Sequence, residues 1–92
     1  MFMVKDHKKT LAKSPPDKIF LVVRGDRIDN LHDLANCIAS LSVDQFHYHV
    51  NDKKNDFAKW IHDVFNEKKL AKSLHKLHDQ KQFVTTIREH LA

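Results

Sequence analysis

Apolar residues recur along most of the chain at the three- and four-residue spacing of amphipathic helices. The clearest pattern predicts a helix over 56–65, and similar patterns predict helices over 31–41, about 43–50, around 70–77 and around 83–91. The apolar faces are Leu31, Leu34, Ala35, Ile38 and Leu41; Val43, Phe46 and Val50; Phe57, Trp60, Ile61, Val64 and Phe65; Leu70, Ala71, Leu74 and Leu77; and Phe83, Val84, Ile87 and Leu91. We expect Trp60 to be buried against the 31–41 helix.

Residues that favour helix ends stand between these segments, and residues 51–55 are expected to form a polar loop. Asn66 follows the 56–65 helix, where asparagine can adopt the left-handed conformation that ends a helix. The candidate N-terminal caps are Asn30, Ser42 with Gln45, Asn55 or Asp56, and Asp79 with Gln82.

The run KIFLVV, residues 18–23, has the β-branched and aromatic composition of a buried strand. Gly25-Asp26 suits a tight turn, and residues 27–29 are expected to form a short return strand. Arg24-Gly25-Asp26 also spells an integrin-binding tripeptide, which we take as a coincidence because no export signal is recognised. The expected fold is therefore α+β and mostly α: a short N-terminal β-hairpin followed by a compact bundle of about five short helices.

The 92 residues fit one small domain, and the single glycine and two prolines disfavour a turn-rich all-β fold. We expect residues 18–92 to form a single globular domain. The preceding segment, 1–17, is lysine-rich and contains Pro15-Pro16, so it is expected to be a flexible basic arm.

The composition limits the cellular location and the kinds of partner that we expect for this protein. Cys37 is the only cysteine, so no internal disulfide forms and a reducing, cytoplasmic location is expected. No apolar run approaches the length of a membrane span. The formal net charge of +4 is spread along the chain, whereas nucleic-acid-binding domains usually concentrate positive charge on one face.

The eight histidines are the most conspicuous candidates for chemistry. A zinc site needs three or four converging ligands. His47 and His49 would point in different directions on a helix, and His75 and His78 would share a helical face but provide only two ligands. We therefore expect no metal and no cofactor. No sequence motif of a nucleophile or a phosphate-binding loop is present, so we expect no enzymatic activity.

The segment 67–81 contains the densest group of lysines. Lys68, Lys72 and Lys76 would lie on one helical stripe with Lys69 beside them. Such a face could contact phosphates or an acidic protein, or it could simply be the solvated side opposite Leu70 and Leu74.

The central stretch of the sequence, about residues 49–71, resembles a known protein family. His49-Val50-Asn51, Asn55-Asp56-Phe57-Ala58, Trp60-Ile61, Asp63-Val64-Phe65 and Leu70-Ala71, preceded by LHDLANCI over 31–38, resemble a family of small archaeal and bacterial domains of unknown function with an HVNxxxNDFAxWIxxV…LA motif. The resemblance covers about residues 18–74 and departs at Lys59 and at Asn66-Glu67. It implies no activity, only an accessory or interaction module.

Three functional hypotheses follow. The first is a non-catalytic protein–protein interaction module whose partner-binding loop contains His49, Asn51, Asn55 and Asp56, although these four side chains could equally serve only to shape the loop. The second is a nucleic-acid-associated protein that uses Lys68, Lys69, Lys72 and Lys76. The third is a histidine-dependent metal or pH sensor.

Overall fold

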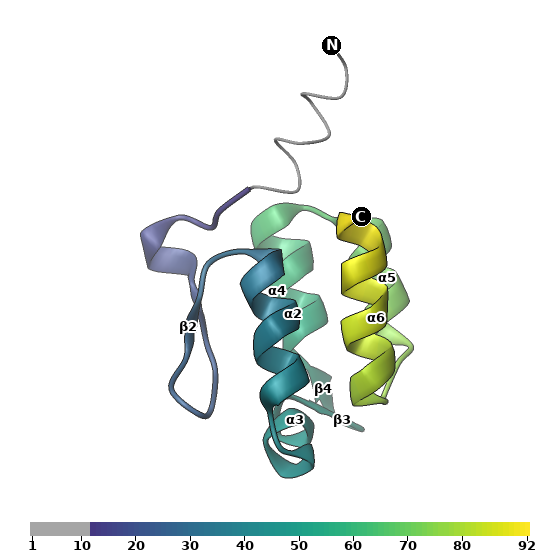
Figure 1. The fold of residues 1–92 in the computed structure, drawn as a ribbon. Helices are drawn as coiled ribbons and strands as arrows, with labels where there is room; N and C mark the ends of the chain where they lie inside the picture. Colours follow the sequence, from purple (N-terminus) through teal and green to yellow (C-terminus); the bar gives the residue numbers. More distant parts are fainter. Residues whose placement is uncertain (1–11) are drawn as a thin grey trace.

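The computed structural model describes residues 12–92. Within this range a short β-hairpin precedes five α-helices, which confirms the expected α+β, mostly α fold (Figure 1). A 3-10 turn η1 (Pro16–Lys18) leads into the antiparallel strands β1 (Phe20–Leu21) and β2 (Arg27–Ile28). The helices are α2 (Leu31–Ser40), α3 (Val43–His49), α4 (Asp56–Phe65), α5 (Lys68–His75) and α6 (Gln80–Leu91).

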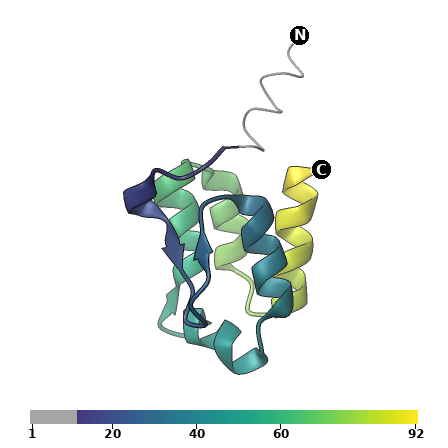
Figure 2. The ribbon, with the colours of Figure 1, turned by 60° about the vertical axis from the view of Figure 1, so that its left-hand side comes forward.

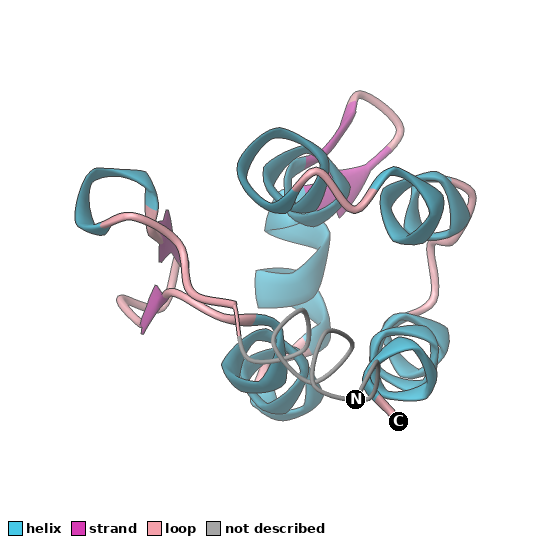
Figure 3. Cartoon of the chain, turned by 90° about the horizontal axis from the view of Figure 1, so that it is seen from above, coloured by secondary structure: helices cyan, strands magenta, loops and turns pink. Residues whose placement is uncertain are grey.

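Helices α2, α4, α5 and α6 stand side by side, and α3 crosses one end of the group (Figure 3). Helix α2 packs against α6, α4 packs against α5, and α5 also contacts α6. The β1–β2 hairpin lies along the side of this bundle (Figure 2). As a result α4 has the hairpin on one flank and α5 on the other (Figure 3).

A second strand pair, β3 (Val50–Asn51) and β4 (Lys54–Asn55), replaces the polar loop expected over 51–55. The side chain of Asn51 fixes this turn because its oxygen accepts the Lys53 N–H at 3.0 Å and its amide donates to the His47 carbonyl at 3.0 Å. A strand of two residues has no periodicity to detect, so the sequence pattern could not reveal it.

The expected helix caps are present. The complete capping box at Ser42 and Gln45 starts α3. Asn55, rather than Asp56, caps α4 by accepting the Ala58 N–H at 3.0 Å. The left-handed Asn66 ends α4 at φ 56°. Side-chain caps also start α2 and α6, at Asn30 and Asp79.

The core follows the apolar faces of the predicted helices, with one exception, whereas the run expected as a buried strand over 18–23 forms only the two-residue β1 and leaves Leu21 and Val23 exposed. The largest fully buried side chains include Phe46, Phe57 and Phe83, whose rings lie within 6.3 Å of one another. Val43 was expected to share the buried face of α3 but is 63% exposed. Val43 is the first residue of α3, one turn before the fully buried Phe46.

Trp60 is buried, but its partners are in the N-terminal segment. Its Nε1–H donates to the Lys18 carbonyl at 2.8 Å, and its ring meets Phe20 edge-on with centroids 5.6 Å apart. Phe65 contacts the indole from within α4. The expected burial of Trp60 is confirmed, and its hydrogen-bond and aromatic partners come from the N-terminal segment and from Phe65.

Most of the expected flexible arm, residues 1–11 of 1–17, lies outside the described residues. In the described remainder, Ser14 is buried and its N–H donates to the Asp29 carbonyl at 2.7 Å. This bond joins the segment before η1 to the end of the hairpin.

At the hairpin tip, Gly25 has φ 111°, a conformation that glycine adopts without strain. The Arg24 guanidinium forms a bidentate pair with Asp26 at 2.9 and 3.0 Å. It also donates to the carbonyl and the hydroxyl of Ser40, at the end of α2. Because the bond to Asp26 favours both charged forms, the pKa of Arg24 is raised and that of Asp26 is lowered.

We predict that Trp60→Ala lowers the free energy of unfolding by about 3–5 kcal/mol, because it opens a large cavity beneath the hairpin. Trp60→Phe should cost only about 1–2 kcal/mol, since it keeps a ring and loses mainly the bond to the Lys18 carbonyl. Urea unfolding followed by circular dichroism measures both. A Trp60→Ala variant as stable as the wild type would contradict this assignment.

Candidate functional site

His49 is a buried histidine that joins three elements. The ring belongs to α3 and is 3% exposed. Its Nε2 accepts the Val23 N–H of the hairpin at 3.0 Å, and its Nδ1 lies 2.9 Å from an oxygen of Asp56, the first residue of α4. Because Nε2 accepts a hydrogen bond, the proton of the neutral ring is on Nδ1 and is donated to Asp56.

This arrangement has the composition of a catalytic histidine–carboxylate pair but not its accessibility. A general base needs a free nitrogen lone pair that faces the substrate. In His49 the Nε2 lone pair is already used by the Val23 amide, and the ring is enclosed by Phe20, Tyr48 and Phe57 at centroid distances of 5.0–5.1 Å. The geometry points to a structural connection.

The other residues of the predicted partner-binding loop also have partners inside the chain. Besides capping α4, Asn55 donates from its amide to the Leu74 carbonyl at 3.0 Å, which joins the start of α4 to the end of α5. Asp56 accepts from His49 and pairs with Lys54 at 3.0 Å. Asn51 holds the β3–β4 turn. The structure thus brings the four predicted residues together, with Asn51 at the turn, Asn55 and Asp56 at the start of α4, and the ring of His49 bonded to Asp56 from the end of α3.

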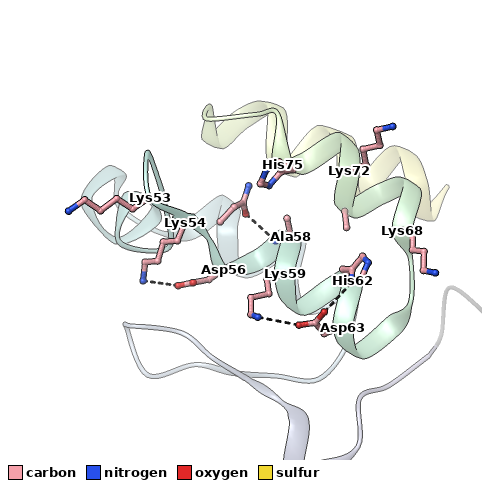
Figure 4. A pocket seen from close by; sticks show the side chains of 12 residues that line it. Lys53, Lys54, Asp56, Ala58, Lys59, His62, Asp63, Lys68, Lys72 and His75 are labelled. Atoms are coloured by element: carbon pink, nitrogen blue, oxygen red, sulfur yellow. Dashed lines mark hydrogen bonds and ion pairs between the residues drawn. The ribbon is translucent and has the colours of Figure 1, made fainter.

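A pocket of about 480 Å³ runs between α4 and α5, and we call it the basic groove (Figure 4). Ala58 and Ala71 are both buried and give it an apolar floor. Ala58 projects from α4 toward α5 in Figure 4. The lining residues are Lys53, Lys54, Asn55, Asp56, Ala58, Lys59, His62, Asp63, Lys68, Ala71, Lys72 and His75.

The charges of the basic groove do not balance. Five lysines face two aspartates, which leaves a surplus of three positive charges with the histidines neutral. Lys54 pairs with Asp56 at 3.0 Å and Lys59 pairs with Asp63 at 3.6 Å. Three lysines have no ion-pair partner among residues 12–92: Lys53, Lys68 and Lys72. The pKa of Asp63 is lowered, first by the hydrogen bond from His62 and further by Lys59.

The structure divides the predicted basic face. Lys68 and Lys72 line the basic groove, whereas Lys69 and Lys76 are exposed but do not line it. Three further lysines, Lys53, Lys54 and Lys59, come from the β3–β4 turn and from α4. Sequence reasoning missed them because they are separated along the chain and meet only when α4 packs against α5.

A second pocket, of about 440 Å³, lies on the other flank of α4, and we call it the hairpin groove. Its apolar part includes the exposed residues Leu21 and Tyr48, at 62% and 56% exposure. The Lys54 ammonium lies 4.6 Å from the centre of the Tyr48 ring. The lining residues are Phe20, Leu21, Tyr48, His49, Lys54, Asp56, Lys59, Trp60, Asp63 and Val64.

The remaining candidates for chemistry are less promising. Among the described residues no group of three or more His, Cys, Asp or Glu side chains is placed to hold a metal ion. His75 ends α5 and His78 lies in the following loop, so the expectation that they share a helical face is wrong. Cys37 is 6% exposed, and burial raises the pKa of its thiol. No helix in the described part of the chain is long and apolar enough to cross a membrane.

Comparison with protein family models identifies the family of the chain. A family model described as a family of unknown function (DUF5752) matches residues 16–92, so the chain belongs to this family. The match covers a longer segment than the resemblance noted in the sequence, 18–74, and includes α6. No curated protein and no solved structure is found to match the chain.

We predict that His49→Phe lowers the free energy of unfolding by about 2–4 kcal/mol, although it keeps an aromatic ring in the same space. The loss arises because the Val23 N–H no longer has its acceptor and Asp56 loses a donor. Amide hydrogen exchange at Val23 should accelerate relative to the Phe83 amide inside α6. Unchanged exchange at Val23 would show that the histidine does not hold the hairpin.

We predict that Asn55→Ala lowers the free energy of unfolding by about 1–3 kcal/mol, because it removes both a helix cap and the bond to the Leu74 carbonyl. Asp79→Ala is the matched control, since it removes only the cap of α6 and should cost about 0.5–2 kcal/mol. Thermal unfolding of both variants gives the comparison. Equal losses would indicate that the bond from Asn55 to α5 contributes nothing.

Proposed function

We propose that the protein is a non-catalytic interaction module that holds an acidic segment of a partner protein in the basic groove. The observation that carries this proposal is the surplus of three positive charges around an apolar floor. Carboxylates of the partner would neutralise the lysines at the rim, while its apolar side chains would cover Ala58 and Ala71.

The unpaired lysines lie at both ends of the groove, which favours an extended ligand. Lys53 comes from the β3–β4 turn beside the start of α4, and Lys68 begins α5. From Lys68 to His75 the helix rises about 10 Å, or roughly three residues of an extended peptide. A short acidic segment can therefore contact Lys53 and the two lysines of α5, Lys68 and Lys72, at once.

The aspartates in the groove favour a protein over a nucleic acid. Asp56 and Asp63 both line it, and a continuous phosphate backbone would bring like charges against them. A peptide can place a neutral or basic side chain at these points. The absence of Lys69 and Lys76 from the groove also divides the stripe that a phosphate backbone would follow.

The non-catalytic part of the proposal is supported by the state of the reactive side chains. The Nε2 of His49 accepts the Val23 amide, and Cys37 is buried with a raised thiol pKa. Asp56 and Asp63 are each engaged in ion pairs. None of these groups is presented to a substrate in the free form that general base or nucleophilic catalysis requires.

Two double variants test the proposal, because they remove the same charge from α5 and its C-terminal cap residue, Lys76. Lys68→Ala with Lys72→Ala removes the two lysines that α5 contributes to the basic groove, whereas Lys69→Ala with Lys76→Ala changes no residue that lines it. We predict that binding of a fluorescent peptide of alternating glutamate and leucine weakens by about tenfold or more in the first pair and by less than about twofold in the second. Fluorescence anisotropy gives both values.

The same two pairs distinguish the nucleic-acid alternative. Duplex DNA held by the whole lysine face would be weakened equally by both pairs, with a steep dependence on salt. Preferential binding of DNA over the acidic peptide, with equal losses in the two pairs, would reject the acidic-protein proposal. Circular dichroism confirms that each variant is folded before binding is compared.

A further inference from the structure

We infer that the hairpin groove is a self-association surface, through which two copies of the chain form a two-fold symmetric dimer. The inference concerns the other flank of α4 and does not require the proposed function to hold, although Lys54, Asp56, Lys59 and Asp63 line both grooves. It draws on two properties of that flank: exposed apolar side chains and a balanced, self-complementary set of charges.

Three of the four large hydrophobic residues that are exposed in the described chain gather at this flank. Leu21 and Val23 alternate with the buried Phe20 and Val22, so both point outward from the hairpin. Leu21 and Tyr48 line the same groove. Val23 is close by, since its N–H is bonded to His49, the neighbour of Tyr48. Exposed apolar side chains that lie close together are typical of interaction surfaces.

The charges at the hairpin groove cancel. Two lysines and two aspartates line it, and they form ion pairs within the chain, Lys54 with Asp56 and Lys59 with Asp63. The chain as a whole carries +4, and the basic groove carries much of this surplus. Two identical basic chains repel each other, so they can approach most closely through a face without net charge.

The order of these charges suits a second copy of the same chain. From β4 along the edge of α4 they alternate as Lys54, Asp56, Lys59 and Asp63. When two such edges are placed antiparallel across a two-fold axis perpendicular to them, Lys54 of each copy faces Asp63 of the other and Asp56 faces Lys59. An unrelated apolar partner would need to reproduce this pattern, whereas a second copy already has it.

Sedimentation of the full chain tests the inference without any added ligand. The wild-type weight-average mass should rise from that of a monomer toward that of a dimer between about 5 and about 500 µM, as expected for a weak interface. A wild type that stays monomeric throughout this range overturns the inference.

Two serine variants examine the apolar part of the surface. Leu21→Ser should weaken association by about tenfold or more, as loss of a buried leucine at an interface does. Val43→Ser is the matched control, because Val43 is 63% exposed, close to the 62% of Leu21, and does not line the groove. Equal effects of the two variants would place the interface elsewhere.

A charge exchange examines the antiparallel arrangement. Asp63→Lys alone and Lys54→Asp alone should each associate less than the wild type, because each places like charges opposite one another. An equimolar mixture of the two should regain the heavier species, since the heterodimer pairs opposite charges. A mixture that stays as monomeric as its components overturns the proposed pairing.

Discussion

The two hydrogen bonds of His49 hold the hairpin, α3 and α4 in one arrangement, and both grooves depend on it. The hairpin strands have two residues each, too few to be stable by themselves. Their position is set by the bond from Val23 to His49, by the indole bond of Trp60 to the Lys18 carbonyl, and by the ring of Phe20 between them. The connection from His49 to Asp56 then fixes where α4 begins relative to the hairpin.

Helix α4 has different electrostatic surroundings on its two flanks. Four charged residues line both grooves: Lys54, Asp56, Lys59 and Asp63. On the hairpin side they balance one another, and the remaining surface is apolar. On the α5 side Lys53, Lys68 and Lys72 are added to the same four charges and make the groove positive. One short helix thereby separates a neutral apolar surface from a basic one.

The elements of this fold were largely predictable from local pattern, whereas the grooves were not. Apolar spacing and capping residues such as Ser42 and Asn55 act within a few positions of the chain, so they predicted the five helices and several of their ends. The bond from Trp60 to the Lys18 carbonyl was not predictable, because periodicity says which face is buried but not what covers it. The basic groove depends on packing between α4 and α5, which brings together Lys53, Lys59 and Lys68 from separate segments. Only the contribution of Lys68 and Lys72 was visible as a helical stripe.

At the hairpin tip, the two charged side chains of a short sequence motif bond to each other and are therefore not free to bind a receptor. Arg24-Gly25-Asp26 spells a cell-adhesion tripeptide, yet the guanidinium and the carboxylate face each other in a bidentate pair. The carbonyl and the hydroxyl of Ser40 accept further hydrogen bonds from the same guanidinium, so the tip is held at the end of α2. A receptor that required the two charges separately would have to displace Asp26 and Ser40 from Arg24 first. In this chain Arg24-Gly25-Asp26 therefore holds the hairpin tip against α2 through hydrogen bonds within the molecule. A search by sequence motif alone would mistake this tripeptide for a recognition signal.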